Sequence, residues 1–339
     1  MGYGLSDEEG RVPDRRRVSA SRAGEFISPS EYLIKGTPSD LSDGEVLFME
    51  YEGRICRSPM ERSAYMLPVA VGCSYNACLF CGLFKHLKYR ELPLAQIEEE
   101  INRVVKANGN PETVFLGDGN AFGIDYENMK YILRLVKKSF PNCKRIHMDA
   151  TVTDISHKTD EQLREMYDLG VRLLYLGIET GLDDVLMLMN KDHHTMDEAK
   201  IQIERLHKAG IDYAAHIMTG IAGKGRGIEN AEALAKFINE TRPTKICNFS
   251  IFIHGKGSMK TLLETGKFTQ ASEYENVVEG HRLLQLIEVP TYIDNMHDLL
   301  EFRVRGNIPQ DKPKMLKKYE DYIASFPEEK KDYAPVMDW

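Results

Sequence analysis

The sequence predicts an α/β protein with a parallel sheet and helices outside it. From residue 67 onward, short apolar runs alternate with amphipathic stretches that have the spacing of helices. Helix-start signals precede several of those stretches, and glycines stand where the helices should end. Six such units follow one another. This number suits a partial (β/α)6 barrel or an open doubly wound sheet, because a full barrel needs eight.

The expected strands are six apolar runs, at residues 67–71, 113–116, 145–149, 173–178, 213–217 and 246–253. Two of the helices between them begin with capping boxes, Thr159 with Gln162 and Thr195 with Glu198. The glycines that would end helices are Gly109, Gly170 and Gly210. Each glycine stands shortly before the next expected strand, so the pattern of starts and stops agrees with the pattern of apolar residues.

The two flanks differ from this repeating region. Residues 1–60 are expected to form an N-terminal arm that is partly flexible, because its first part is rich in Ser, Gly, Pro, Asp and Arg. Residues 61–255 would form the barrel. Residues 256–339 are expected to be a helical C-terminal extension, because apolar stripes with helical spacing occur within residues 271–325.

Composition and charge exclude several classes of protein. Apolar residues make up 42% of the chain and charged residues 28%, as in ordinary soluble proteins. No apolar run is long enough to span a bilayer, and the N-terminus lacks the apolar segment of a secretory signal. A cytoplasmic protein is therefore expected, with no membrane partner. The net charge of −8 argues against a broad grip on nucleic acid.

Three of the six cysteines are clustered and follow the first expected strand directly. Cys73, Cys78 and Cys81 have the spacing C-x4-C-x2-C. The other three, Cys56, Cys143 and Cys247, are isolated in the sequence and are expected to be buried small apolar residues or inert thiols. A secreted disulfide framework would be denser, so the cluster points instead to a metal site.

Three kinds of metal site remain open on the spacing alone. A structural zinc site would need a fourth ligand, and no second C-x2-C completes one. A plant-type ferredoxin cluster uses C-x4-C-x2-C and a later cysteine, but this chain is far larger than an electron carrier needs. In the third kind, three thiolates bind three irons of a [4Fe–4S] cluster and leave the fourth iron open to a chelating ligand.

The segment from Cys73 to Cys81 resembles the cluster loop of the radical S-adenosylmethionine (radical SAM) superfamily. That loop usually reads C-x3-C-x2-C with an aromatic residue, here Phe80, before the last cysteine; this chain has one extra residue between the first two. Residues 176–191, LGIETGLDDVLMLMNK, resemble the branch that contains oxygen-independent coproporphyrinogen oxidases and tRNA methylthiotransferases. The resemblance covers roughly residues 65–255 and implies a partial (β/α)6 TIM-like barrel.

This resemblance implies two cofactors, a [4Fe–4S] cluster on the three clustered cysteines and S-adenosylmethionine (SAM) on its open iron. The residues implied to bind SAM are Phe80, Gly117, Asp118, Gly119, Asn120, Glu179, Gly220 and Gly223. The implied chemistry is reductive cleavage of SAM to a 5′-deoxyadenosyl radical, which abstracts a hydrogen atom from a substrate.

Strand alternation predicts which side chains face the barrel lumen. The apolar face of each expected strand should pack against helices, which leaves the polar face inside. The expected inward residues are His147, Asp149, Glu179, His216, Asn248, Ser250 and His254. The candidates for catalytic roles among them are His147, Asp149, His216 and His254. A plain core would not hold so many polar groups, because each costs free energy unless it is paired.

The sequence therefore predicts an oxygen-sensitive radical SAM enzyme that acts on a small or medium-sized organic substrate. Its partner would be an electron donor such as flavodoxin or ferredoxin, and its reaction class, whether oxidoreductase, transferase or lyase, stays open. Two alternatives come from other classes: an iron–sulfur electron carrier or sensor without SAM chemistry, and a zinc protein that binds a partner. Within the class, an enzyme that modifies RNA or a peptide is the alternative.

Overall fold

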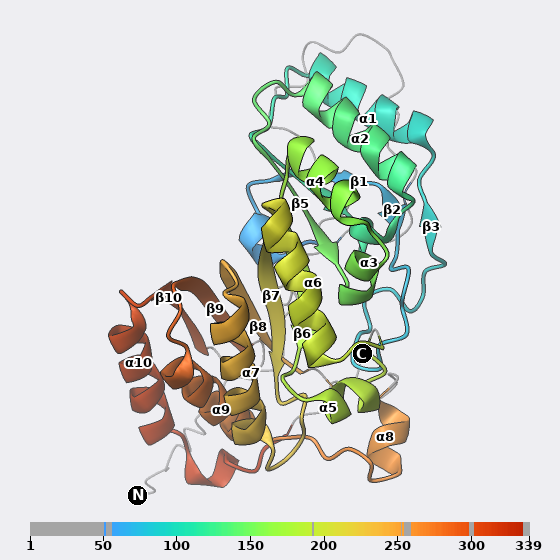
Figure 1. The fold of residues 1–339 in the computed structure, drawn as a ribbon. Coiled ribbons are helices and arrows are strands. Elements are labelled where there is room, and N and C mark those ends of the chain that lie inside the picture. Colours follow the sequence, from blue (N-terminus) through green and yellow to red (C-terminus); the bar gives the residue numbers. More distant parts are fainter. Residues whose placement is uncertain are drawn as a thin grey trace, which may run out of the picture.

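The structure is a computed structural model that describes residues 51, 56–191, 193–251, 253, 259–297 and 302–334. Within them, eight strands form one curved sheet with helices outside (Figure 1). In spatial order the strands are β1 (Tyr65–Pro68), β4 (Thr113–Gly117), β5 (Arg145–Ala150), β6 (Val171–Glu179), β7 (Asp212–Thr219), β8 (Lys245–Ser250), β9 (Thr291–His297) and β10 (Phe302–Ile308). Each neighbouring pair is parallel except β9 and β10. The strand order runs from β1 to β10 without closing, so the predicted partial barrel is confirmed.

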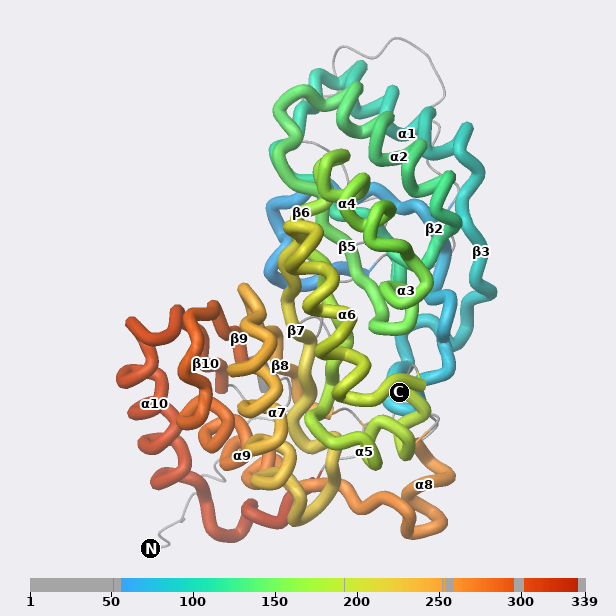
Figure 2. Tube along the Cα trace, in the orientation of Figure 1, coloured from blue at the N-terminus to red at the C-terminus, as the bar shows by residue number. Residues whose placement is uncertain are grey.

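The helices pack along the outside in nearly the same order as the strands. They are α1 (Leu94–Lys106), α2 (Tyr126–Ser139), α3 (Val152–Ser156), α4 (Asp160–Asp168), α5 (Asp183–Leu188), α6 (Met196–Ala209), α7 (Gly227–Thr241), α8 (Lys260–Glu264), α9 (Glu273–Leu286) and α10 (Lys312–Ala324). The 3-10 helices are η3 (Pro59–Glu61), η4 (Ala121–Gly123) and η5 (Glu328–Lys330). Figure 2 shows α1 and α2 at one end of the sheet and α10 at the other. No helix in the described residues is both long and apolar enough to cross a membrane.

All six expected strands are present, and the local signals act as predicted. The first expected strand divides into β1 and a short β2 (Ala70–Val71). Thr159 and Thr195 each form a full capping box at the start of α4 and α6. Gly210 ends α6 in the left-handed conformation, with φ +88°. These signals lie within a few residues of each other in sequence, so they need no distant partner.

The C-terminal segment differs from the expectation of helices alone. The two apolar stripes do form α9 and α10, but β9 and β10 lie between them and extend the sheet. In β9, Thr291, Ile293 and Asn295 are all buried. Asp294, on the other face, is buried as well, and the three polar residues among these four obscure the apolar pattern of a strand.

The two faces of the sheet have different neighbours. Leu116, Met148 and Leu176 belong to the large apolar core between the sheet and the helices. On the inner face, Phe115 and Tyr175 form a smaller apolar cluster that fills part of the lumen. The predicted inward placement therefore holds for the third to fifth expected strands, where His147, Tyr175 and His216 share this inner face.

The predicted facing of the sixth expected strand is wrong. In β8 the inward residues are Lys245, whose Nζ lies 3.3 Å from the Tyr175 hydroxyl, and Phe249, whose ring contacts His216. Asn248 and Ser250 are fully buried on the opposite side. The Asn248 side chain accepts a hydrogen bond from the Thr219 amide at 3.1 Å. Polarity therefore does not identify the inner face of β8, because the Asn248 side-chain oxygen is bound by neighbouring backbone on the outer face.

Candidate active site

The three clustered cysteines lie on one loop that is closed at its base. β2 pairs antiparallel with β3 (Arg90–Glu91), so residues 72–89 leave and return to the same place. Cys73, Cys78 and Cys81 are all partly buried on this loop. The loop follows the first strand, at the carboxyl ends of the parallel strands, where folds of this kind build their active sites.

This cysteine loop is attached to the segment that follows α5. The Tyr75 hydroxyl donates to the Asn190 carbonyl at 2.7 Å, and Asn190 Nδ2 donates to the Ala77 carbonyl at 3.1 Å. The Leu79 amide also donates to the Met189 carbonyl at 2.9 Å. These bonds bring Lys191 to the cysteine loop although it is distant in the sequence.

Lys191 and Glu179 form a buried charged pair between the cysteines and the lumen. Lys191 Nζ lies 3.8 Å from Glu179 Oε1. Both groups crowd the position of Gly177, where a Cβ would stand 2.5 Å from Glu179 Oε1 and 2.8 Å from Lys191 Nζ. Burial raises the pKa of Glu179 to about 7, although Lys191 lowers it in part. Gly177 is the register partner of His216 on the neighbouring strand β7. Lys191 and Glu179 therefore lie at the edge of the lumen.

The electrostatics of the thiols fit a set of metal ligands. Burial raises the pKa of all three, to about 12 for Cys78, while the positive charge of Lys191 lowers the pKa of Cys73 and Cys78 in part. Cys73 and Cys81 both raise the pKa of Cys78, and Cys73 raises that of Cys81, so the three thiols are neighbours. Without a metal they are protonated at neutral pH; a bound metal deprotonates its thiol ligands.

The described residues contain no group of three or more His, Cys, Asp or Glu side chains gathered as ligands of a single metal ion. In a [4Fe–4S] cluster each thiolate binds a different iron, so the thiols need not converge on one point. Three adjacent thiols on one loop, beside a buried ammonium group, therefore fit such a cluster.

The predicted SAM-binding turn, residues 117–120, packs against the start of the cysteine loop. Gly119 has φ +42°, and a Cβ there would stand 2.6 Å from the Gly72 carbonyl oxygen and 3.0 Å from Cys73 Cα. Asn120 Nδ2 donates to Ser74 Oγ at 2.7 Å and also to Asp154. Only a glycine allows the turn and the loop to approach this closely.

Asp118, in the same turn, is bound by the N-terminal segment. Its carboxylate accepts hydrogen bonds from the Tyr51 hydroxyl, the Cys56 amide at 3.1 Å and the Gly119 amide at 2.9 Å. Burial raises the pKa of Asp118 to about 6, and these bonds lower it in part. The structure thus gives this carboxylate protein partners of its own.

The remaining predicted SAM-binding residues lie at the periphery of this region. Gly220 has φ +80°, and its amide donates to Glu279 Oε2 of α9 at 2.8 Å. A Cβ at Gly223 would stand 2.9 Å from the Thr269 carbonyl oxygen. Phe80 packs against a small apolar cluster that includes Met189. Contacts with helix α9 and its neighbouring loop therefore explain both glycines without a cofactor.

Two of the four predicted catalytic residues present unsatisfied polar atoms in the lumen. Asp149 Oδ1 and His216 Nε2 are buried and have no hydrogen-bond partner in the described residues. Asp149 pairs with Tyr175 and His216 with Gly177, so the two residues stand on the strands that flank β6, offset by two residues along the sheet. Burial raises the pKa of Asp149 well above its usual value and lowers that of His216 to about 4. His216 is therefore neutral at neutral pH, and burial favours the protonated form of Asp149.

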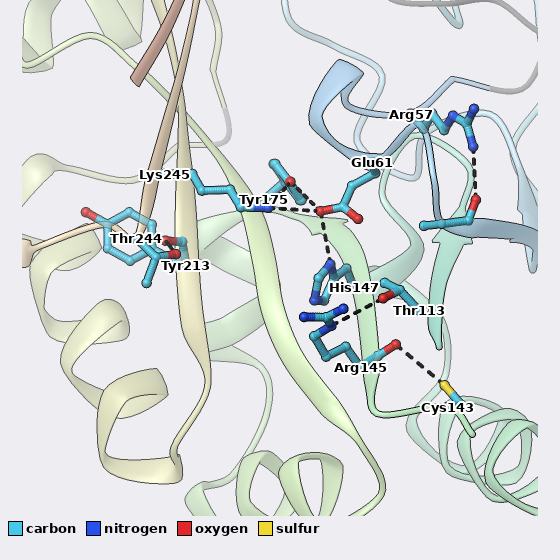
Figure 3. Close-up of polar contacts among 11 residues, drawn as sticks. Arg57, Glu61, Thr113, Cys143, Arg145, His147, Tyr175, Tyr213, Thr244 and Lys245 are labelled. Carbon is cyan, nitrogen blue, oxygen red and sulfur yellow. Dashed lines mark hydrogen bonds and ion pairs between the residues drawn. The ribbon is translucent and has the colours of Figure 1, made fainter. Parts of the chain in front are cut away.

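His147, the third, lies deeper and is paired; His254 falls outside the described residues. His147 Nδ1 lies 3.0 Å from Glu61 Oε1 (Figure 3). The same oxygen accepts from the Tyr175 hydroxyl at 2.5 Å and lies 3.3 Å from Lys245 Nζ. Burial opposes ionisation of Glu61, but these hydrogen bonds and charges lower its pKa to about 2.

Glu61 and Lys191 are the two site residues that sequence reasoning missed. Glu61 precedes the first strand and reaches β5, β6 and β8, which no local pattern indicates. Lys191 could have been found from the sequence. It is a single lysine at the end of an apolar run, within the segment 176–191 that resembles the radical SAM branch. Its burial beside Glu179 reveals its place in the site.

These features define an iron–sulfur enzyme built on a partial barrel, and comparison with known proteins identifies the family. The Radical SAM superfamily model matches residues 67–238, about half of the chain. The chain belongs to the radical SAM superfamily and is an enzyme of that class, with SAM and a [4Fe–4S] cluster as its cofactors. The resemblance predicted from the sequence is confirmed.

Individual relatives are distant and cover only part of the chain. The heme chaperone HemW of Bacillus subtilis (strain 168) is 22% identical over 156 residues, which are 44% of this chain and 41% of HemW. Among solved structures, TsrM of Kitasatospora setae, a radical SAM methyltransferase, has 15% identity and a TM-score of 0.48 over 58% of this chain and 38% of its own. Coproporphyrinogen III oxidase (HemN) of Escherichia coli has 12% identity and a TM-score of 0.46 over 66% and 50%. The chain thus spans about two fifths of the length of its curated relative.

The close approach of the Gly119 turn to the cysteine loop leads to a test. Gly119→Ala is expected to reduce iron loading several-fold, because its Cβ would collide with the Gly72 carbonyl and displace Cys73. Gly225→Ala is the matched control, since Gly225 has φ +79° but no atom within 4 Å of the added Cβ. It should cost only about 1 kcal/mol of stability and leave loading unchanged. Equal iron content in both variants, measured after anaerobic reconstitution, would show that the contact does not matter.

Proposed function

We propose that this enzyme generates a 5′-deoxyadenosyl radical next to the barrel lumen and uses it to abstract a hydrogen atom from a small or medium-sized organic substrate. The observation that carries the proposal is the order of groups along one path. The three thiols lie next to Lys191 and Glu179, and this pair lies at Gly177 beside His216. From the cysteine loop to the lumen, the cluster ligands are thus followed by the charged pair and then by His216 with its unpaired nitrogen.

Cys73, Cys78 and Cys81 would hold the cluster, and Glu179 and Lys191 would contact SAM. When bound, the cluster and SAM supply the carbon–sulfur cleavage that yields the radical. SAM carries an amino group and a carboxylate, so a buried carboxylate and a buried ammonium group offer one partner to each. The charges of Glu179 and Lys191 are little screened by solvent, because both side chains are buried.

Asp149 and His216 would contact the substrate. Their unpaired atoms stand on rigid strands, and each costs free energy until a ligand supplies a hydrogen bond. Because His216 is neutral at neutral pH and burial favours the protonated form of Asp149, the two groups suit an uncharged polar part of a substrate, with protonated Asp149 as donor. His147 lies two residues nearer the amino end of β5 than Asp149 and would not contact the substrate. There Glu61, Tyr175 and Phe115 fill the lumen and exclude water from that side.

The cluster needs an external electron, which we propose comes from a flavodoxin or ferredoxin in the cytoplasm. The cysteine loop is partly exposed, so a carrier can approach it. The direct test is anaerobic incubation of the cluster-loaded protein with SAM and dithionite. Methionine and 5′-deoxyadenosine in equal amounts are expected. An iron–sulfur carrier or sensor would instead leave SAM intact, and its cluster spectrum would not change when SAM is added.

The raised pKa of Glu179 predicts a pH dependence of SAM binding. The carboxylate is largely protonated below about pH 7 and ionised above it, and only the ionised form attracts the amino group of SAM. The affinity of the cluster-loaded protein for SAM should therefore rise between about pH 6 and about pH 7.5, as measured by anaerobic calorimetry. Glu179→Gln should weaken binding about tenfold at the higher pH and flatten the profile. An unchanged slope in Glu179→Gln would assign the titration to another group.

A further inference from the structure

A pocket opens at the end of the barrel opposite the cysteine loop. Its volume is about 280 Å³, and η3 and the inner face of β8 to β10 form its walls. Lys245 is the first residue of β8 and Tyr292 the second of β9, so the pocket lies at the amino ends of these two parallel strands. The cysteine loop lies at their carboxyl ends.

The β-hairpin β9–β10 supplies two arginines to this pocket. Arg303 and Arg305 alternate with Phe302 and Val304, which are buried on the other side. Phe302 stacks on Tyr322 of α10 with ring centroids 4.1 Å apart, and this packing fixes the facing of the strand. Both guanidinium groups therefore project from the inner face.

The charges around the pocket are unbalanced. Arg62, Lys245, Arg303 and Arg305 bring four positive charges to its wall, and Asp294 brings one negative charge. Arg303 Nε donates to Asp294 Oδ1 at 2.7 Å, and a second N–H donates to the other carboxylate oxygen.

Two further contacts bear on the charge balance of this pocket. Lys245 lies 3.3 Å from Glu61 and Arg303 pairs with Asp294, so the three positive charges of Lys245, Arg303 and Arg305 face two carboxylates. Arg305 lies directly opposite Asp294 in the strand register, yet Asp294 is taken by Arg303, and Arg305 has no ion pair in the described part of the chain. This local excess contrasts with the net charge of −8 for the whole chain.

We propose that this pocket binds a small oxyanion carrying two or more negative charges, such as a phosphate-bearing or polycarboxylate metabolite. Arginine presents a planar pair of N–H groups that matches the oxygens of phosphate and carboxylate. The volume is close to the lower end of the range for ligand pockets, so the ligand is compact. The Tyr292 ring offers a wall for an organic part of the ligand.

The pocket is separate from the radical chemistry. Glu61 and the apolar cluster that includes Met66, Phe115 and Tyr175 stand between it and the upper lumen. Anion binding therefore needs neither the cluster nor SAM. Failure of the proposed radical chemistry would leave this inference standing, and failure of anion binding would leave the radical chemistry standing.

Calorimetric titration of the full chain with inorganic pyrophosphate, with and without a reconstituted cluster, tests the proposal. Saturable binding of one pyrophosphate per chain is expected at low salt, with lower affinity as salt is raised. Arg305→Ala should weaken binding at least about tenfold, and Arg305→Glu should abolish it. Arg164→Ala is the matched control, because Arg164 is exposed on the outer helix α4 and lies outside this pocket.

Three results would overturn the proposal: no saturable binding to the unmodified chain, equal binding to Arg305→Glu, or displacement of pyrophosphate by excess SAM. The last would place the anion in the cofactor site. A parallel titration with citrate distinguishes the two ligand sources, since tighter binding of pyrophosphate assigns a phosphate ligand and tighter binding of citrate a polycarboxylate. Arg305 is exposed, so its variants should unfold at the same temperature as the unmodified chain, which checks that they are folded.

Discussion

Alanine at Cys73, Cys78 or Cys81 is expected to abolish cluster loading, whereas the unmodified chain should take up about four iron and four sulfide after anaerobic reconstitution. The reason is that each thiolate binds a separate iron, and a cluster that leaves one iron open has no spare protein ligand. Iron and sulfide assays with the visible absorption spectrum measure the result. The alanine variants should stay folded, because all three side chains are only partly buried on a loop outside the sheet.

The matched controls are alanine at the other three cysteines, which should leave loading intact. Cys247 lies within β8, and Cys143 precedes β5, so both are far from the loop in the fold. Cys56 is the stricter control. Burial, and then the charges of Asp118 and Asp149, raise the pKa of its thiol well above the usual value, so it stays protonated. Loss of cluster in Cys56→Ala would mean that the fourth iron has a protein ligand, as in a ferredoxin-like site.

Much of the fold was predictable because its signals are local. A capping box joins residues three apart, as at Thr159 and Gln162, and the alternating pattern of β5 lies within six residues. The cysteine spacing is equally local. The order of these parts along the chain then identified the barrel and its cofactors without any tertiary contact.

The features that escaped prediction depend on contacts between distant residues. Glu61 joins His147 and Tyr175, which are 86 and 114 residues further along the chain. The facing of β8 was misjudged because Asn248 finds its partner in the Thr219 backbone, whereas polarity alone suggested the lumen. Strand β9 was missed because buried polar residues such as Asn295, which donates to Tyr319 at 2.7 Å, interrupt the apolar pattern. In each case a buried polar group makes a hydrogen bond with a partner that only the fold supplies.

Asp149→Asn and His216→Ala are expected to separate radical formation from its use. Both residues face the lumen with unpaired atoms, and neither lies on the cysteine loop or in the Glu179–Lys191 pair. Cluster content, SAM affinity and slow formation of 5′-deoxyadenosine without substrate should therefore stay near those of the unmodified enzyme. In the unmodified enzyme, the small-molecule fraction of a cell extract that contains the substrate should accelerate 5′-deoxyadenosine formation. This acceleration should fall about a hundredfold in each variant, because hydrogen abstraction needs close and oriented contact.

The matched control is His281→Ala, since His281 lies on the outer helix α9, where its ring contacts Tyr319. It should retain the full response to substrate. The response should also be insensitive to protonation of His216 between about pH 6 and about pH 8, because burial lowers its pKa to about 4 and the ring stays neutral throughout. Collapse of the fold in both lumen variants, seen as lost cluster and lower unfolding temperature, would assign Asp149 and His216 to a structural network. An undiminished response in both would place the substrate elsewhere.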